Sequence, residues 1–436
     1  MKMTIVGAGP SGTTAALLLA RAGHQVTLVD RDPGPRADGT WDRVGVMQFR
    51  LPQGLRGPGR LFLESRLPDV HQALLDAGAA YGAVPHGAPP FTAGLHLRRS
   101  TMERVLWSCA DREPGIMRRT GHVDALVRAG DRVTGVVVDG ELVRSDLVVD
   151  AGGKAGHLGQ HLRPQAQETA APFAYVAREY RLLPGAGPGP VEPGPGLAIP
   201  HDGFMEMVFV QDAGTFQTLV VRRAEDHELA LLREEAAHDV ASAMLPGIAT
   251  WTAPDRAEPI GPVRAGAGLV NRFHRQPSSA TGLLAIGDAL LVTNPMAARG
   301  LSLGMAAAGR LADVVGSLPD TEWAGAMDAW AEAELLPWYD DHCAVDATMH
   351  ARWRHEPVAA DGPVGWDVIA DAAHDHPDWM PVIGPYFGMF ALPTVLEPVR
   401  EQVRAQLREG WQPRVPGGVT RDELADAVRS AVAVPA

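Results

Sequence analysis

The sequence predicts an α/β fold, in detail an α+β composite of a βαβ domain with a β-meander, a sheet-rich domain and a helical C-terminal region. Three observations support it. A glycine turn between two apolar runs occupies residues 4–30, apolar and polar residues alternate through 115–153, and helical patterns dominate after residue 321. A chain of 436 residues has room for two to three such domains.

The first stretch, TIVGAGPSGTTAALLLARAGHQVTLVD at 4–30, predicts a strand, a glycine turn, a helix and a second strand. Gly7 permits the tight turn, Gly9 lets a pyrophosphate approach the backbone, and Gly12 lets the helix pack on the sheet. From Ser11 onward the helix N-terminus offers free N–H groups to phosphates. We therefore predict a dinucleotide site at this turn.

An acid ends the second strand, as this type of site requires. Asp30 lies where a carboxylate accepts hydrogen bonds from ribose hydroxyls. Asp30 followed by Arg31 does not distinguish FAD from NAD.

Composition excludes several classes of protein. A net charge of -13 argues against nucleic acid as a partner and against an anionic membrane surface. No apolar run is long enough for a membrane span, and the N-terminus does not have the pattern of a signal peptide. Cys109 and Cys343 lie too far apart for a metal motif or a disulfide framework, so we expect two buried thiols, no metal site and a cytoplasmic protein.

The rest of the chain divides by local pattern. We expect an irregular functional loop over 31–60, a Pro/Gly loop over 184–196, and a β-meander over 115–153 with Asp139-Gly140 as a hairpin turn. The remaining strands are expected at 173–182, 204–210, 215–221 and 282–286. Helices are expected at 67–79, from a Ser100 N-cap with Glu103 in a capping box, at 225–243, at 301–315, and from 321 onward with breaks near Pro357 and Pro363 and a last helix after Thr420.

A second piece of cofactor chemistry lies at 283–304, LLAIGDALLVTNPMAARGLSLG. A strand ending in Gly287-Asp288 places a carboxylate near a ribityl hydroxyl, and a helix opened by Pro295 and Gly300 points its N-terminus at negative charge. With a meander between the two halves, this pattern indicates FAD rather than a simple NAD dehydrogenase.

The sequence resembles the FAD-dependent monooxygenases of the para-hydroxybenzoate hydroxylase fold, and more closely the actinobacterial branch of polyether-type olefin epoxidases. The resemblance spans nearly the whole chain. It is carried by the motifs GAGPSG with Asp30, RVGVMQ at 43–48, Arg99 with Met102 and Glu103, DAGG at 150–153, GDALLVTNPMAARG at 287–300, and PWY at 337–339.

The resemblance implies a set of site residues. No catalytic side chain is identified, because FAD carries the chemistry, with Pro295, Ala298 and Gly300 beside its ring. The implied cofactor-binding residues are Gly7, Gly9, Ser11, Gly12, Asp30, Arg31, Arg43, Gln48, Arg99, Val123, Asp150, Gly287, Asp288, Pro295, Arg299, Gly300 and Leu301.

Two positions depart from the family pattern. Ala298 replaces the first glycine of the loop beside the flavin, and Ala151 replaces the glycine of a motif that supports both FAD and NAD(P)H. The electron source is therefore left open between NAD(P)H and a partner flavin reductase.

The resemblance also implies a domain division. It comprises a Rossmann-like FAD-binding domain at 1–80, 98–165 and 280–320, a β-sheet substrate domain at 81–97 and 166–279, and a helical C-terminal region at 321–436.

The implied activity is monooxygenation. Reduced flavin would react with O₂ to give a C4a-hydroperoxide, which epoxidises or hydroxylates a small apolar natural-product intermediate. Met205 and Met207, which alternate with Phe204 and Val208, line an apolar pocket or pack in the core. The alternatives are a flavin-dependent reductase of isoprenoid double bonds, a halogenase, which the position of the two lysines disfavours, and a non-catalytic FAD carrier.

Overall fold

A parallel sheet joins strands from residues 2–150 and 283–285. A computed structural model describes the chain at residues 1–156, 158–192 and 196–433. The strand order of the sheet is β18-β9-β1-β2-β5. The strands are β1 (Lys2–Val6), β2 (Gln25–Asp30), β5 (Ile116–Thr120), β9 (Leu147–Asp150) and β18 (Leu283–Ala285).

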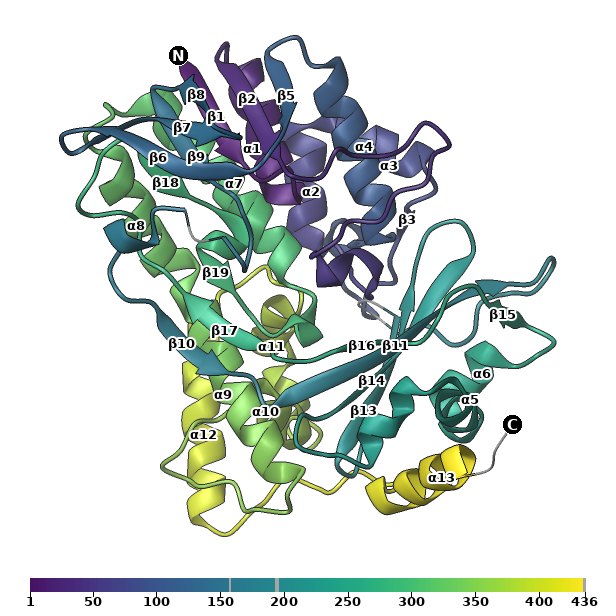
Figure 1. The fold of residues 1–436 in the computed structure, drawn as a ribbon. Helices are drawn as coiled ribbons and strands as arrows, with labels where there is room; N and C mark the ends of the chain where they lie inside the picture. Colours follow the sequence, from purple (N-terminus) through teal and green to yellow (C-terminus); the bar gives the residue numbers. More distant parts are fainter. Residues whose placement is uncertain (157, 193–195, 434–436) are drawn as a thin grey trace.

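The two faces of this sheet are covered differently (Figure 1). Met3, Ile5 and Val149 share one core with helices, whereas Val29 and Val148 share another with the meander. The helices on this side are α1 (Pro10–Arg21), α2 (Gly57–Arg66), α3 (Pro68–Asp76), α4 (Arg99–Arg112), α7 (Gly300–Ser317) and α8 (Trp323–Glu334).

The meander is smaller than the sequence predicts. Only β6 (Val123–Ala129), β7 (Arg132–Val138) and β8 (Glu141–Arg144) form it, while β5 and β9 join the parallel sheet beside β2 and β1. Alternation identifies a strand but not its partner, which explains the error. The hairpin turn between β7 and β8 is confirmed, since Asp139 and Gly140 have φ values of 49° and 79°.

An antiparallel sheet forms the sheet-rich part, with the order β12-β13-β14-β11-β15 and β16 paired to β11. One face packs on helices through Phe204 and Val208, and the other carries Met205 and Met207. Its elements are β11 (Phe173–Leu182), β12 (Gly196–His201), β13 (Phe204–Val210), β14 (Thr215–Arg223), β15 (Ala257–Pro259), β16 (Arg264–Gly266), η4 (Leu229–Arg233), α5 (Glu235–Met244) and α6 (Pro246–Thr252).

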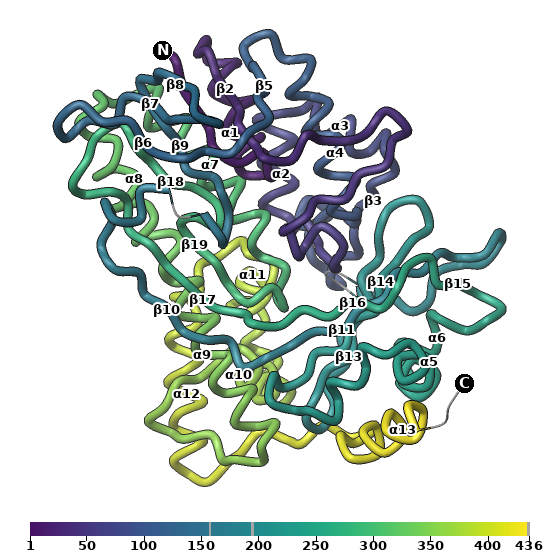
Figure 2. Tube along the Cα trace, in the orientation of Figure 1, coloured from purple at the N-terminus to yellow at the C-terminus, as the bar shows by residue number. Residues whose placement is uncertain are grey.

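Shorter strands and a helical layer complete the molecule (Figure 2). The strands are β3 (Ala80–Tyr81), β4 (Leu95–His96), β10 (Gln167–Ala170), β17 (Val270–Phe273) and β19 (Leu291–Val292). The helical segments are η1 (Met47–Arg50), η2 (Pro90–Thr92), η3 (Gln160–Leu162), η5 (Gly287–Ala289), η6 (Pro295–Ala297), α9 (Leu336–Arg352), α10 (Trp366–Ala372), η7 (Pro377–Trp379), α11 (Met380–Phe387), η8 (Pro393–Leu396), α12 (Glu397–Arg408) and α13 (Arg421–Ala433).

The last helix lies far from the helices that precede it. Thr420 caps α13 through a reciprocal hydrogen bond with Glu423, and Leu424 and Val428 then pack in the core formed by α5 and the antiparallel sheet. Figure 1 shows α13, in yellow, beside the teal α5. The chain therefore returns to the sheet-rich part at its end.

Several local expectations are wrong. Helix α4 begins at Arg99 with Arg98 as its N-cap, because the Glu103 carboxylate of the expected capping box instead binds arginines. Residues 31–60, expected to be an irregular loop, include η1 and the start of α2. The expected helix at 225–243 is split into η4 and α5. Strand β12 begins at the end of the expected Pro/Gly loop, whose residues 193–195 lie outside the described part.

Two further features bear on the class of protein. In the described ranges no helix is both long and apolar enough to cross a bilayer. Both thiols are free, Cys109 being buried and Cys343 only half-buried.

Candidate functional site

The glycine turn between β1 and α1 serves two separate purposes. A Cβ on Gly7 would lie 2.2 Å from the carbonyl oxygen of Ala151, and one on Gly12 would lie 1.9 Å from that of Gly7. Gly7 also has a φ of 105°, which favours glycine. A Cβ on Gly9 would meet nothing within 4 Å. Two glycines are thus required by the protein's own packing, whereas Gly9 leaves room in front of α1.

Asp30 ends β2 beside this open space. Its Oδ2 accepts hydrogen bonds from the Ala8 N–H at 2.7 Å and from the Arg43 guanidinium at 2.6 Å, and its Oδ1 accepts the Asp32 N–H at 2.9 Å. The loop after β2 is therefore folded back onto the glycine turn by the same acid that the sequence singles out.

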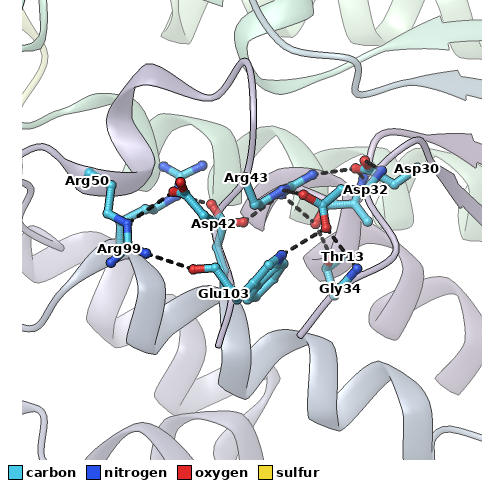
Figure 3. A network of polar contacts seen from close by, with 11 residues as sticks. Thr13, Asp30, Asp32, Gly34, Asp42, Arg43, Arg50, Arg99 and Glu103 are labelled. Carbon is cyan, nitrogen blue, oxygen red and sulfur yellow. Dashed lines mark hydrogen bonds and ion pairs between the residues drawn. The ribbon is translucent and has the colours of Figure 1, made fainter. Parts of the chain in front are cut away.

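A buried chain of charges extends from Asp30 to α4 (Figure 3). Arg43 is 7% exposed and donates to the Glu103 carboxylate at 2.6 Å, and Glu103, 2% exposed, also pairs with Arg99 one turn earlier. Two arginines and two acids alternate, so each buried charge has a partner. Arg43 and Arg99 are both expected from the sequence, but the role of Glu103 as the link between them depends on the tertiary structure.

The second half of the site is joined to the first by close helix packing. A Cβ on Gly304 of α7 would lie 2.3 Å from Ser11 Oγ, and one on Gly287, which has a φ of 61°, would lie 2.7 Å from it. Ser11 is therefore used in contact between α1 and the segment that runs from η5 into α7.

Asp288 lies in the opening between the two halves. Its side chain is accessible, yet the surrounding protein raises the pKa of its carboxyl through desolvation, against the lowering effect of the positive charges of Arg99 and Lys154. A carboxyl group that solvent reaches, although many protein atoms surround it, is typical of a cleft. Arg99 and Asp288, 189 positions apart in the sequence, thus face the same space.

The loop η6 is held by a buried polar network. The side chain of Asn294 caps η6 by accepting from the Met296 N–H, and it also receives the Tyr175 hydroxyl proton. Asp346 accepts amide donors from Asn294 and Asn271, each at 2.7 Å. Burial raises the pKa of Asp346 to about 6.

Ala298 follows η6 in the left-handed conformation, with φ 52° and ψ 38°. A side chain there costs roughly 1 kcal/mol relative to glycine. The alanine that departs from the family pattern therefore occupies a strained backbone conformation. Gly300, where a Cβ would meet nothing within 4 Å, begins α7 beside this loop.

The side chain of Arg299 is engaged within the protein. Its guanidinium is 3% exposed, donates to Asp341 at 2.7 Å and to the Tyr386 hydroxyl at 2.6 Å, and lies 4.6 Å from the centroid of the Trp338 ring. Trp338, from the PWY motif, packs in the core of the helical layer. The donors of Arg299 serve the helical layer, so its side chain is not available to a cofactor.

The other expected ligands lie around the same opening without forming one cluster. Asp150, at the end of β9, is buried and pairs with Arg163 at 2.7 Å. Arg31 is exposed, with its guanidinium over Gly45. Half-buried positions are occupied by Gln48 in η1, Val123 at the start of β6 and Leu301 in α7.

A cavity of about 1600 Å³ lies on the other side of η6. Met205 and Met207 of β13 form one wall, and Met296 of η6 lines it as well. The two methionines of β13 line this cavity and also pack in a core cluster, so both interpretations of their alternation hold. Trp353, at the end of α9, and Trp366, at the start of α10, also line the cavity, and no local pattern in the sequence indicates either of them.

Open backbone at two helix N-termini fits a dinucleotide. At Gly9 before α1 and at Gly300 in α7, an added Cβ would meet nothing within 4 Å. Asp30 binds the N–H of Ala8, next to Gly9, and Asp288 follows Gly287, which packs near Gly304 of α7. N–H groups at a helix start favour phosphate, and acids suit ribose and ribityl hydroxyls.

Comparisons with known proteins agree with this geometry. The family model described as "FAD binding domain" matches residues 1–348. Kynurenine 3-monooxygenase of Salinispora arenicola is 31% identical over 176 residues, which is 37% of this chain and 38% of that protein. D-amino acid dehydrogenase 2 of Ralstonia nicotianae is 44% identical over 61 residues, 14% of each chain. The chain thus matches 38% of the length of the first of these curated relatives and 14% of the second.

Solved structures share the fold at low identity. The flavin-dependent brominase Bmp2 has a TM-score of 0.67 at 16% identity, covering 94% of this chain and 99% of its own. PqsL, a probable FAD-dependent monooxygenase from Pseudomonas aeruginosa, has a TM-score of 0.62 at 16% identity, with coverages of 81% and 98%. The flavin-dependent halogenase CmlS has a TM-score of 0.61 at 19% identity, with coverages of 99% and 77%.

Proposed function

Because this chain belongs to the FAD-binding-domain family, we propose that it is an FAD-dependent monooxygenase that inserts one oxygen atom from O₂ into an apolar natural-product intermediate, by epoxidation or hydroxylation. The observation that carries the proposal is the position of η6. This loop follows Asp288 and precedes Gly300, and Met296 and Ala297 within it line the large cavity. One loop thus borders the cofactor opening and an apolar cavity.

The proposed cofactor site uses both halves of the opening. The N–H groups in front of α1 at Gly9 would hold the pyrophosphate, Asp30 the ribose, and Arg99 with Asp288 the ribityl side. Pro295, Ala298 and Gly300 would lie beside the ring. When bound, FAD supplies the redox chemistry and the activation of oxygen.

The chain's own residues would exclude water and orient the substrate. The thioethers of Met205 and Met207 and the indole of Trp353 make the cavity wall apolar, and a dry wall protects a reactive oxygen donor from water. Since transfer of oxygen to an alkene requires no protein nucleophile, the lack of an evident acid–base pair in the sequence is consistent with this reaction. The motifs RVGVMQ and PWY support placing the chain near the polyether-type olefin epoxidases.

The source of electrons is the second part of the proposal. Asp150 is buried against Arg163, and Ala151 packs beneath Gly7, so the half-matched motif serves the protein's own packing. We therefore propose that a partner flavin reductase or free reduced flavin supplies the electrons. Anaerobic stopped-flow mixing with NADH or NADPH tests this, and rapid bleaching by either nucleotide alone would refute it.

A halogenase is the principal competing function, because several structural neighbours are halogenases. Such an enzyme requires a lysine near its substrate. The lysines of this sequence are Lys2 on β1 and Lys154, whose ammonium donates to the Gly268 carbonyl at 2.8 Å, and neither lines the cavity. The composition of the cavity therefore favours oxygen transfer.

The experiment that tests the function is labelled turnover. Holoenzyme with chemically reduced FAD, ¹⁸O₂ and a panel of apolar olefins and arenes should give products that contain one ¹⁸O atom by mass spectrometry. A parallel reaction with chloride and bromide should give no halogenated product. Halide incorporation without ¹⁸O incorporation would replace the proposal with the halogenase function.

A further inference from the structure

Four arginines line the large cavity, and three of them already have an acidic partner. Arg299 pairs with Asp341 at 2.7 Å, Arg352 with Asp367 at 3.0 Å, and Arg414 with Asp375 at 2.6 Å. The fourth, Arg56, has no carboxylate at ion-pair distance in the part of the chain that the structure describes. A cation in an apolar cavity without an internal counter-ion indicates a counter-ion from outside.

The surroundings of Arg56 keep most of its donors available. The guanidinium donates to the carbonyl oxygen of Phe387, the last residue of α11. A guanidinium has five N–H donors, so one backbone acceptor leaves the fork largely unused. Burial lowers the pKa of Arg56 to about 10, with the positive charge of Arg299 acting in the same direction, and the group is still a cation at neutral pH.

The backbone at Arg56 favours negative charge as well. Arg56 is the N-cap residue of α2, and no side chain caps that helix. Gly57, at the first turn, lines the cavity next to it. The positive end of the helix dipole and the guanidinium therefore act on the same part of the cavity.

We infer that the substrate is a large apolar molecule carrying one carboxylate, which forms an ion pair with Arg56. This inference rests on the proposed function, because it takes the cavity to be the substrate site. A guanidinium fork matches the two oxygens of a carboxylate. A cavity of about 1600 Å³ is larger than the roughly 300 to 1,000 Å³ that holds a drug-sized ligand, which suits a long or polycyclic carbon skeleton. With its carboxylate at Arg56, that skeleton would occupy the cavity whose wall includes Met205, Met207 and Met296 of η6.

The test compares an acid with its ester. Binding of linoleic acid and methyl linoleate to the holoenzyme is measured below their aggregation concentrations by quenching of the protein's tryptophan fluorescence. Trp353 and Trp366 line the cavity and contribute to this signal. The acid should bind at least ten times more tightly than the ester. In Arg56→Met this preference should fall to about one, and Arg56→Lys should retain part of it.

A matched control uses another arginine of the same cavity. Arg414→Met removes a cation that already pairs with Asp375, so the preference for the acid should be unchanged. Flavin content and Tm are measured for every variant, which separates loss of folding from loss of the anion site. Equal binding of acid and ester to the unmodified protein, or a preference that survives in Arg56→Met, would overturn the inference.

This outcome is independent of the proposed activity. The acid preference is a binding measurement and needs no turnover, whereas the ¹⁸O experiment needs no anionic substrate. An enzyme that oxygenates neutral olefins and prefers the ester would keep the proposed function and remove the role of Arg56.

Discussion

Two acids of this site, Asp30 and Asp346, hold other parts of the protein in place. By our proposal Asp30 also binds the cofactor. Asp30 accepts two backbone N–H groups and the Arg43 guanidinium, so it holds the loop after β2 as well as the position of a ribose. Asp346 holds two asparagine side chains and, through Asn294, the loop η6. Substitutions at these residues should therefore change two properties that can be measured separately.

Asp30→Ala should weaken FAD binding by about 1 to 3 kcal/mol, since a charge-assisted hydrogen bond is lost. Titration of the apoprotein with FAD, followed by flavin fluorescence, measures the effect. Asp69→Ala is the control, because Asp69 pairs at the surface with Arg21, which ends α1 at the opposite end from the glycine turn. Unchanged affinity in the Asp30 variant would remove this residue from the site.

The pKa of Asp346 predicts a pH dependence of stability. The folded-state pKa is about 6, whereas an unfolded aspartate has a pKa of roughly 3.9. The folded state thus binds the proton of Asp346 more tightly than the unfolded state does. The stability that protonation of Asp346 contributes is fully present below about pH 4 and is lost as the pH rises through about 6. The loss should be of the order of 3 kcal/mol.

Asp346→Asn should remove this component, so the free energy of unfolding should change less between pH 4 and pH 6.5 than in the unmodified protein. Urea titrations at a series of pH values measure it. The comparison uses the slope and not the absolute stability, because asparagine also changes the hydrogen bonds to Asn271 and Asn294. A slope identical to that of the unmodified protein would assign the effect to other acids.

At the scale of elements, the turn between β1 and α1 and the packing of α1 on α7 determine the shape of the site. Gly7 and Gly12 are required by contacts within the protein, and Gly9 is not. Ser11 lies between Gly287 and Gly304, so α7 presents its N-terminus beside that of α1. A site between two helix N-termini therefore depends on glycines in two distant segments.

Substitution of two glycines separates packing from binding. Gly9→Ala should leave Tm within about 2 °C, because its Cβ meets no protein atom, but should lower FAD occupancy strongly by occupying the space for the pyrophosphate. Gly12→Ala should reduce both Tm and FAD occupancy. The loss of stability should be about 1 to 3 kcal/mol, because the added Cβ would overlap the Gly7 carbonyl oxygen.

Gly316→Ala is the matched control for these two variants. Gly316 is in helix α7 and its Cβ would also meet nothing within 4 Å, so the change should be neutral or stabilising by up to about 1 kcal/mol. Calorimetry and the ratio of flavin to protein absorbance report the two properties. Full flavin occupancy in Gly9→Ala would contradict the proposed cofactor position.

At the scale of the whole molecule, the chain crosses between its parts more than once. The parallel sheet takes strands from residues 2–6 and from 283–285, and α13 returns to the sheet-rich part after the helical layer. The division into an FAD-binding domain, a substrate domain and a C-terminal region stays a prediction, and the packing of α13 identifies the segment at which it can be tested.

Leu424→Ala should destabilise the sheet-rich part by about 2 to 5 kcal/mol, because Leu424 is fully buried between α13 and α5. Flavin occupancy at room temperature should be unchanged, since α13 does not pack on the parallel sheet. Thermal unfolding followed by flavin release and by tryptophan fluorescence distinguishes the two parts. Val432→Ala, at an exposed position of the same helix, should have little effect, and early flavin release in Leu424→Ala would show that the parts unfold together.

The sequence by itself determined the features that depend on neighbouring residues. The glycine turn, the strand that ends in Asp30, the loop before α7 and the Asp139-Gly140 hairpin each follow from backbone conformations that few residues adopt, so short patterns were sufficient to find them. The strands 173–182 and 204–210 were also predicted with the bounds that the structure has, because their apolar patterns are strong.

Only the tertiary structure decided which of these elements meet. It joined β5 and β9 to the parallel sheet, linked Arg43 to Arg99 through Glu103, and turned Arg299 into the helical layer. Among the residues that the structure describes, it also left Arg56 with no carboxylate at ion-pair distance. Each result depends on how segments far apart in the chain pack together. Local periodicity reports whether a side chain is apolar or charged, but the burial and pairing of a charge depend on which distant segment packs against it.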